Sequence, residues 1–153
     1  MTPIQTAITG KENLVDIKDD KHKALTAFYK AFNGRDFALM QKNWLNSEEI
    51  AMDNPLGGIK RGWEEIKEIY TRIFSGKALV YVEYYDYSII DIDGGFCAVG
   101  RERGSVTIGD KTLELAIRTS RVYKLVDGEY KQVHHHGSIE NPKLLDTYQT
   151  LVK

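Results

Sequence analysis

The chain has 153 residues, of which 42% are hydrophobic. This length and composition suffice for one buried core, but the chain is too short for two ordinary domains. Its 21 Lys and Arg residues against 22 Asp and Glu residues leave a formal net charge of -1 without a basic segment, which argues against a nucleic-acid partner. A single cysteine, no secretory signal at the start and no run of about 20 apolar residues predict a cytoplasmic protein without a membrane partner.

Residues 1–15 are expected to form a flexible arm, and residues 16–153 a single domain. The arm carries no sustained apolar period, so we expect it to contact the core little. A short strand is expected at residues 50–53, before a turn rich in Pro and Gly. Three helices are predicted from apolar residues three and four positions apart: Leu25, Phe28 and Phe32; Phe37, Met40 and Trp44; and Trp63, Ile66, Ile69, Tyr70 and Ile73.

The second half of the chain predicts a sheet. Runs of β-branched and aromatic residues cover residues 78–91, 96–108, 111–126 and 130–139. Short turns of Asp and Gly separate them, so neighbouring strands should pair antiparallel, and a last helix should begin at Pro142. The predicted class is α+β, with a curved antiparallel sheet packed against three N-terminal helices. Gly100 and Gly104 are positions where the sheet can bend around a concavity.

Arginines are the first candidates for a binding site. Alternation puts Arg101 and Arg103 on one strand face and Glu102 on the other, while Arg121 and Tyr123 end a core-facing row on the next strand. A buried arginine needs an anion, either a ligand carboxylate or phosphate or an internal Asp or Glu. An internal partner is the simpler explanation for one arginine, whereas two arginines converging on one pocket favour a ligand. The predicted ligand-binding residues are Arg101, Arg103, Arg121 and Tyr123.

Histidines and one aspartate are candidates for proton transfer. Strict alternation would place His134 and His136 on one face, in the pocket, and turn His135 away. An imidazole transfers protons near neutral pH, and Asp53 before its turn would be a general base or a partner for an arginine. Structural roles within the sheet and the turn are the alternatives. No Cys pair or second His cluster offers a third ligand, so neither a metal site nor a cofactor is predicted.

The chain's closing segment carries a family resemblance. The strand Arg121-Val122-Tyr123-Lys124, an Asp-Gly turn and the segment Val133-His134-His135-His136-Gly137-Ser138 resemble the nuclear transport factor 2-like superfamily, in particular its SnoaL-like branch and the association domain of calcium/calmodulin-dependent kinase II. The resemblance covers residues 16–138. It implies a cone in which helices close over a curved sheet, and dimers formed through the outer face of that sheet. By position, Arg103 and Arg121 would match pocket arginines of the kinase domain.

Two functions are compatible with the sequence. The first is a pocket protein for an anionic or polar organic ligand, with isomerase, cyclase or hydrolase activity as possible chemistry and Asp53, His134 and His136 as catalytic residues. The alternative is a non-catalytic self-association domain, favoured by the tyrosine-rich strand at residues 78–91. In either case we expect a homodimer or a higher homo-oligomer.

Overall fold

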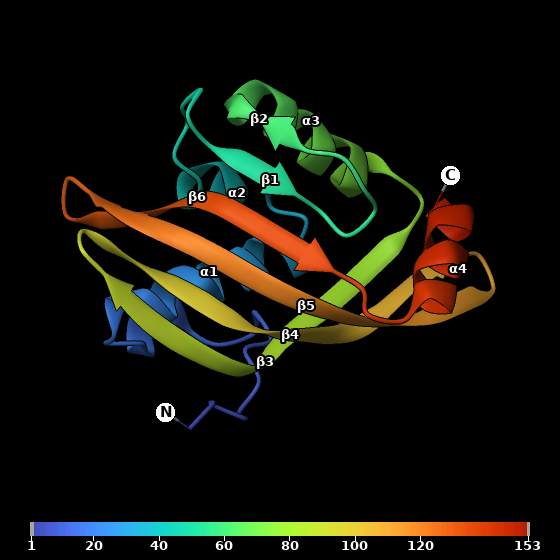
Figure 1. The fold of residues 1–153 in the computed structure, drawn as a ribbon, viewed down its shortest axis with the longest axis horizontal. Coiled ribbons are helices and arrows are strands. Elements are labelled where there is room, and N and C mark those ends of the chain that lie inside the picture. The colour runs from blue at the N-terminus through green and yellow to red at the C-terminus, as the bar shows by residue number, and fades with distance from the viewer. Residues whose placement is uncertain (1, 153) are drawn as a thin grey trace.

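Six strands form one curved, open sheet in the computed structural model, which describes residues 2–152 (Figure 1). The strands are β1 (Ala51–Asp53), β2 (Lys60–Arg61), β3 (Leu79–Ile92), β4 (Gly95–Ile108), β5 (Lys111–Val126) and β6 (Glu129–Ser138). Their order in the sheet is β2-β1-β6-β5-β4-β3, with β3 to β6 as an antiparallel meander and β1 parallel to β6. The predicted meander is confirmed, and β1 and β2 extend its edge.

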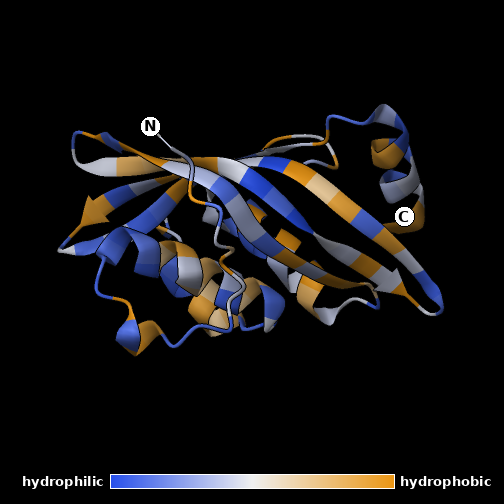
Figure 2. Ribbon diagram, turned by 90° about the horizontal axis from the view of Figure 1, so that it is seen from below, coloured by the Kyte–Doolittle hydropathy of each residue, from blue (hydrophilic) through white to orange (hydrophobic). Residues whose placement is uncertain are grey.

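The helices cover one face of this sheet. They are a short 3-10 turn (Leu14–Asp16), α1 (Asp20–Asn33), α2 (Phe37–Asn43), α3 (Gly62–Ser75) and α4 (Pro142–Val152). Asp19 and Asp36 begin α1 and α2 as N-caps, because their carboxylates accept the backbone N–H of Lys21 and Leu39. Figure 2 shows hydrophilic and hydrophobic residues alternating along the long strands, so one face packs on the helices. No helix within residues 2–152 is both long and apolar enough to cross a membrane.

The segment before α1 contacts the core, contrary to expectation. Ile4 and Ile8 donate their backbone N–H groups to Tyr87 and Tyr84 of β3, at 2.7 and 2.8 Å, and Ile8 is 1% exposed. Gly10 has φ +83°, and a Cβ there would lie 2.6 Å from the Tyr29 carbonyl carbon, so only glycine fits. Little core contact was expected of this segment, and Ile8 is a buried contact that the expectation did not include. A single buried isoleucine in a polar segment leaves no periodic pattern to recognise.

One irregularity in β6 decides which side chains face the helices. Val122 of β5 pairs with His134, whereas the next residue, Tyr123, pairs with Gln132, so Val133 is an extra residue without a partner. Such a bulge reverses the alternation along the rest of the strand. Gln132 before the bulge and His135 after it are consequently both buried on the inner face.

Candidate functional site

Arg121 lies at the centre of a buried polar cluster on the inner face of the sheet. Its Nη2 donates to Glu102 Oε2 at 3.0 Å, its Nη1 to Gln132 Oε1 at 2.9 Å and its Nε to the Tyr29 hydroxyl at 3.2 Å. The guanidinium carbon also lies 3.5 Å from the centre of the Phe28 ring. Arg121 comes from β5, Glu102 from β4, Gln132 from β6 and Tyr29 from α1, so four elements hold it in place.

Protonation in this cluster is fixed by its surroundings. Burial alone would lower the pKa of Arg121, but the neighbouring acidic groups, Tyr29 and Glu102, raise it, so the guanidinium stays charged. Burial raises the pKa of Tyr29 well above its usual value, and its hydroxyl donates to Glu102 Oε2 at 2.6 Å. The sequence predicted that a buried arginine would need an anion, and an internal glutamate supplies it.

Tyr123 does not line a cavity, although it shares the buried face with Arg121. Its hydroxyl donates to Asn43 Oδ1 at 2.8 Å, and Gln132 Nε2 donates to the same oxygen at 3.1 Å. Asn43 in turn donates to the carbonyl of Ala24 at 2.9 Å. These contacts join β5 and β6 to α2 and α1, and they explain the burial of Tyr123 by structure alone.

A cavity of about 80 Å³ lies beside the cluster, between the inner face of the sheet, α3, the loop at residues 54–56 and α4. Its polar wall consists of Glu102, Arg121, His135 and Asn54. The remaining wall is apolar or aromatic and comes from Phe28, Phe32, Met52, Ile69, Tyr70, Ile73, Val80, Val82, Leu115, Ile117 and Tyr148, among others. A hydrophobic cavity with a few converging polar groups is the usual form of a ligand site.

His135 faces this cavity, which corrects the prediction that it turns away. The extra residue Val133 reverses the alternation, so His135 points inward and its two neighbours point outward. Burial, and then the charge of Arg121, hold the pKa of His135 well below its usual value, so the ring is neutral. A Cβ on Gly137 would lie 2.9 Å from Pro55 Cδ and 3.4 Å from His135 Nε2, so glycine leaves room for the loop to pass over the ring.

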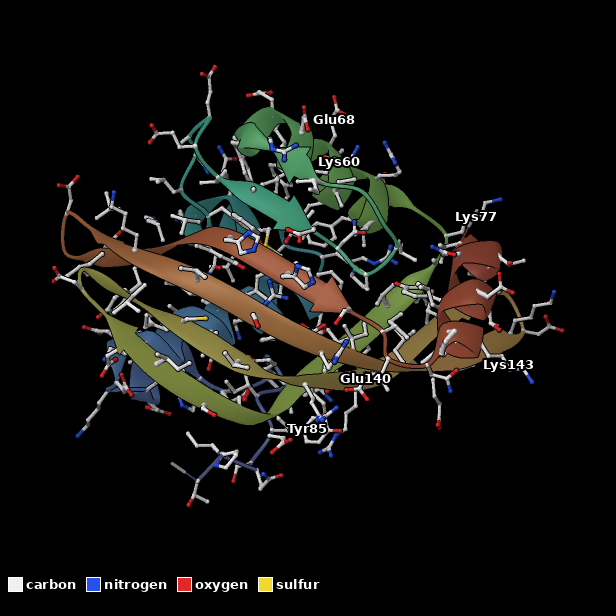
Figure 3. All side chains as sticks on the ribbon, viewed as in Figure 1. Lys60, Glu68, Lys77, Tyr85, Glu140 and Lys143 are labelled. Carbon is white, nitrogen blue, oxygen red and sulfur yellow. The ribbon has the colours of Figure 1, made fainter. Side chains whose placement is uncertain are left out.

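The other two predicted arginines lie on the outer face of the sheet. Arg103 donates to Glu83 Oε1 at 2.7 Å and stacks 4.1 Å from the centre of the Tyr85 ring. Arg101 pairs with Asp86 at 3.3 Å and with Glu140 at 3.6 Å. Both arginine side chains are about half exposed. Tyr85 and Glu140, which are labelled in Figure 3, border one hollow with Arg101.

The predicted convergence of Arg103 with Arg121 is therefore wrong. Alternation along β4 was predicted correctly, but the residue that it turns toward Arg121 is Glu102. A signal for this was present in the sequence. Glu102 shares its face with Ala98, Gly100 and Gly104, and small residues of this kind make room for tightly packed neighbours. At Gly100 a Cβ would lie 2.6 Å from Tyr87 Cβ.

The three predicted catalytic residues come together, but outside the cavity. Parallel pairing of β1 with β6 sets Asp53 opposite His136, and His134 follows on the same outer face. The Asp53 carboxylate is hydrogen-bonded through Oδ2 to His136 Nδ1, and its Oδ1 lies 3.8 Å from His134 Nε2. Donor atoms from the three side chains lie within 4.8 Å of one another, a spacing at which they could hold a metal ion. Asp53 is thus a third candidate ligand, which the sequence argument against a metal did not count.

Comparison with known proteins identifies the family of this chain. A model of the SnoaL-like domain matches residues 22–142. No curated protein matches the chain. A solved structure from Thiobacillus denitrificans, named for the association domain of calcium/calmodulin-dependent protein kinase type II, has 25% identity and a TM-score of 0.64, covering 78% of this chain and 94% of that one.

Two further solved structures share the fold at lower identity. A protein of the nuclear transport factor 2-like family from Streptomyces avermitilis, whose name suggests a dehydratase, has 16% identity and a TM-score of 0.73, covering 80% of this chain and 95% of that one. An uncharacterised protein with a cystatin-like fold from Caulobacter vibrioides has 18% identity and a TM-score of 0.67, covering 87% and 96%. The predicted resemblance and the predicted fold class are confirmed.

Proposed function

The chain belongs to the SnoaL-like domain family, and from that premise we propose that its interior cavity binds a compact organic molecule with one polar, hydrogen-bonding end. The observation that carries the proposal is that only one oxygen of the Glu102 carboxylate accepts hydrogen bonds from the described part of the protein. Both hydrogen bonds that it accepts among residues 2–152, from Tyr29 and Arg121, end on Oε2. Oε1 accepts none of these bonds, and Glu102 lines the cavity, so this oxygen is available to a ligand hydroxyl or amide.

The charge of the site favours a neutral ligand over an anion. Arg121 and Glu102 form an ion pair at 3.0 Å, so their charges largely cancel. A ligand carboxylate or phosphate beside Arg121 would also lie beside Glu102 and be repelled by it. Of the two ligand types compatible with the sequence, the polar one fits better than the anionic one.

The size of the cavity limits the ligand. A volume of about 80 Å³ is well below the about 300–1,000 Å³ of pockets for drug-sized molecules. One wall consists of the loop at residues 54–56 and Tyr148 of α4, and Gln149 joins the loop to α4 by donating to the Leu56 carbonyl at 3.0 Å. A ligand that enters between this loop and α4 would have to break this contact.

The proposal is one of binding, without a named reaction. Asp53, His134 and His136, the residues expected to move protons, lie on the other face of the sheet. Isomerase, cyclase or hydrolase activity in the cavity would have to use Glu102, Arg121, His135 or a tyrosine instead.

The test uses compounds of matched shape and different charge. Phenol and benzamide carry a neutral hydrogen-bonding group, and benzoate is their anionic counterpart. We expect the neutral compounds to raise the melting temperature of the wild-type protein more than benzoate does. Leu115→Trp fills the cavity and should abolish the effect, whereas Glu114→Trp places the same side chain on the outer face and should preserve it. No stabilisation of the wild type, or stabilisation retained in Leu115→Trp, would refute the proposal.

A second function is favoured by the outer face of β3, β4 and β5. Ile90 and Val99 are 45% and 41% exposed there, and Cys97 pairs in register with Ile90 and with Val122. Exposed apolar side chains grouped on one face of a sheet are typical of an interface. We propose that two copies of the chain associate through this face, and the solved relative from Thiobacillus denitrificans is named for an association domain.

Sedimentation of the wild type against Val99→Glu tests this association. A charge in the middle of the face should convert a dimer or larger assembly to monomer, while Thr112→Glu, an exposed position at the far end of β5, should leave it unchanged. A monomeric wild-type protein at micromolar concentration would refute self-association.

A further inference from the structure

The cluster of Asp53, His134 and His136 lies on the outer face where β1 pairs with β6, and it belongs to neither proposed function. We propose that it binds a divalent transition-metal ion of the zinc class. Two paired strands fix the backbone of all three residues, so the donor groups are brought together by the fold. The side chains of Asp53, His134 and His136 are 24%, 38% and 54% exposed, so an ion can reach them from solvent.

The spacing of the donor atoms suits a metal ion. Zinc lies about 2.0–2.1 Å from imidazole nitrogen and carboxylate oxygen, which sets tetrahedral ligand atoms about 3.3 Å apart. His134 Nε2 lies 3.8 Å from Asp53 Oδ1, His136 Nδ1 already contacts Oδ2, and one atom from each residue lies within 4.8 Å of the others. A metal ion bound to His136 Nδ1 replaces the hydrogen bond to Asp53, so the hydrogen on Nδ1 moves to Nε2 of the same ring, and side-chain rotations complete the geometry.

The hydrogen bond made by the other ring nitrogen of His134 also supports a metal site. Its Nδ1 lies 2.9 Å from the carbonyl oxygen of Ala51, which can only accept, so Nδ1 carries the hydrogen. In this tautomer Nε2 carries the lone pair, and it lies 3.8 Å from Asp53 Oδ1, so it is the nitrogen available to a metal ion beside the Asp53 carboxylate. A histidine held by a backbone carbonyl at one nitrogen and binding metal with the other is the usual arrangement in metalloproteins.

The donor set selects the class of ion. Two imidazoles and one carboxylate suit zinc, iron(II), cobalt or nickel, whereas calcium and magnesium require more oxygen ligands. Three protein ligands leave at least one position for water or another ligand, since zinc binds four. The exposed side of His136 places that position toward solvent.

Titration of zinc into the chelator-treated, tag-free protein, followed by calorimetry, tests the site. We expect one zinc ion per chain, and at least tenfold weaker binding in each of Asp53→Asn, His134→Ala and His136→Ala. His22→Ala removes a histidine on α1, and Cys97→Ser removes the single thiol, and both should bind zinc as the wild type does. Thermal unfolding without metal checks that each variant is folded.

Nitrogen-15 spectra of the histidine rings provide a second readout. Zinc should shift Nε2 of His134 while its Nδ1 stays protonated, as the Ala51 contact requires. Absence of stoichiometric binding, or binding retained in both Asp53→Asn and His136→Ala, would overturn the proposal. A metal bound through Cys97 would overturn it as well, and the loss of binding in Cys97→Ser would show this.

Discussion

Glu102 and Arg121 form an ion pair at 3.0 Å with side chains only 7% and 3% exposed, and each is the other's neutralising partner. Charges buried to this degree stay in a protein only when they are paired, because desolvation of each is costly. The pair therefore holds β4 and β5 to α1 through Tyr29, and it also forms the polar wall of the cavity.

Removing one partner of this pair should destabilise the protein more than removing both. Arg121→Met leaves an uncompensated carboxylate and should lower the free energy of unfolding by about 3–5 kcal/mol. The double variant Arg121→Met with Glu102→Gln should recover part of this loss. Urea unfolding of both single variants and the double variant measures the coupling, and additive losses would contradict a shared role.

Protein stability should fall as the solution becomes acidic because of His135. Its pKa in the folded protein is held below the usual value of about 6.5 by burial and by Arg121, with smaller contributions from His134 and His136. Below pH 6.5 the unfolded chain therefore binds a proton that the folded chain does not. Stability is complete above this pH and is lost as pH falls toward the folded-state pKa, by up to about 1.4 kcal/mol per pH unit.

Urea unfolding of chelator-treated protein between pH 7 and pH 5 checks this slope. His135→Gln removes the titrating ring, so its stability should depend less steeply on pH than that of the wild type. Equal slopes for the two proteins would show that His135 is accessible to protons in the folded state.

Gly137 should not tolerate even a methyl group. Its Cβ would lie 2.9 Å from Pro55 Cδ, in the loop that passes over His135. We expect Gly137→Ala to cost about 1–3 kcal/mol of stability and to weaken phenol binding. Gly137 does not have a positive φ, so the loss would come from this contact and not from backbone strain. Unchanged stability of Gly137→Ala in urea unfolding would exclude the steric argument.

Cys97 reports on association through the outer face. Burial raises the pKa of its thiol, so alkylation should be slow near neutral pH and should accelerate toward alkaline pH. If copies pack on this face, alkylation of the wild type should also slow as protein concentration rises, whereas Val99→Glu should show no such dependence. Iodoacetamide labelling followed by mass spectrometry measures both rates.

Most of the fold could be predicted from sequence because the long elements carry local signals. Apolar residues at helical spacing located α1, α2 and α3, and Asp-Gly turns separated the four long strands. The site needed information that local patterns lack. Strict alternation assigned His134 and His136 to the cavity, but the one-residue bulge at Val133 turned His135 there instead.

The cluster on the outer face shows a different case, in which the predicted residues lie together but outside the cavity where they were expected. Asp53, His134 and His136 were selected for their chemistry, yet nothing in the sequence indicates that β1 pairs in parallel with β6. The prediction that Arg103 lies in the cavity was wrong for a related reason. Its partner Glu83 lies 20 residues away on a neighbouring strand, and such cross-strand ion pairs leave no local signature.

The extra residue in β6 also bears on how this strand could change in descent. Val133 has no partner in β5, so loss of its codon would leave Gln132 paired with Tyr123 and His134 paired with Val122. Ordinary alternation from Gln132 would then still turn His134 outward and His135 inward. Relatives that are one residue shorter at this point are therefore expected to enclose the same histidine.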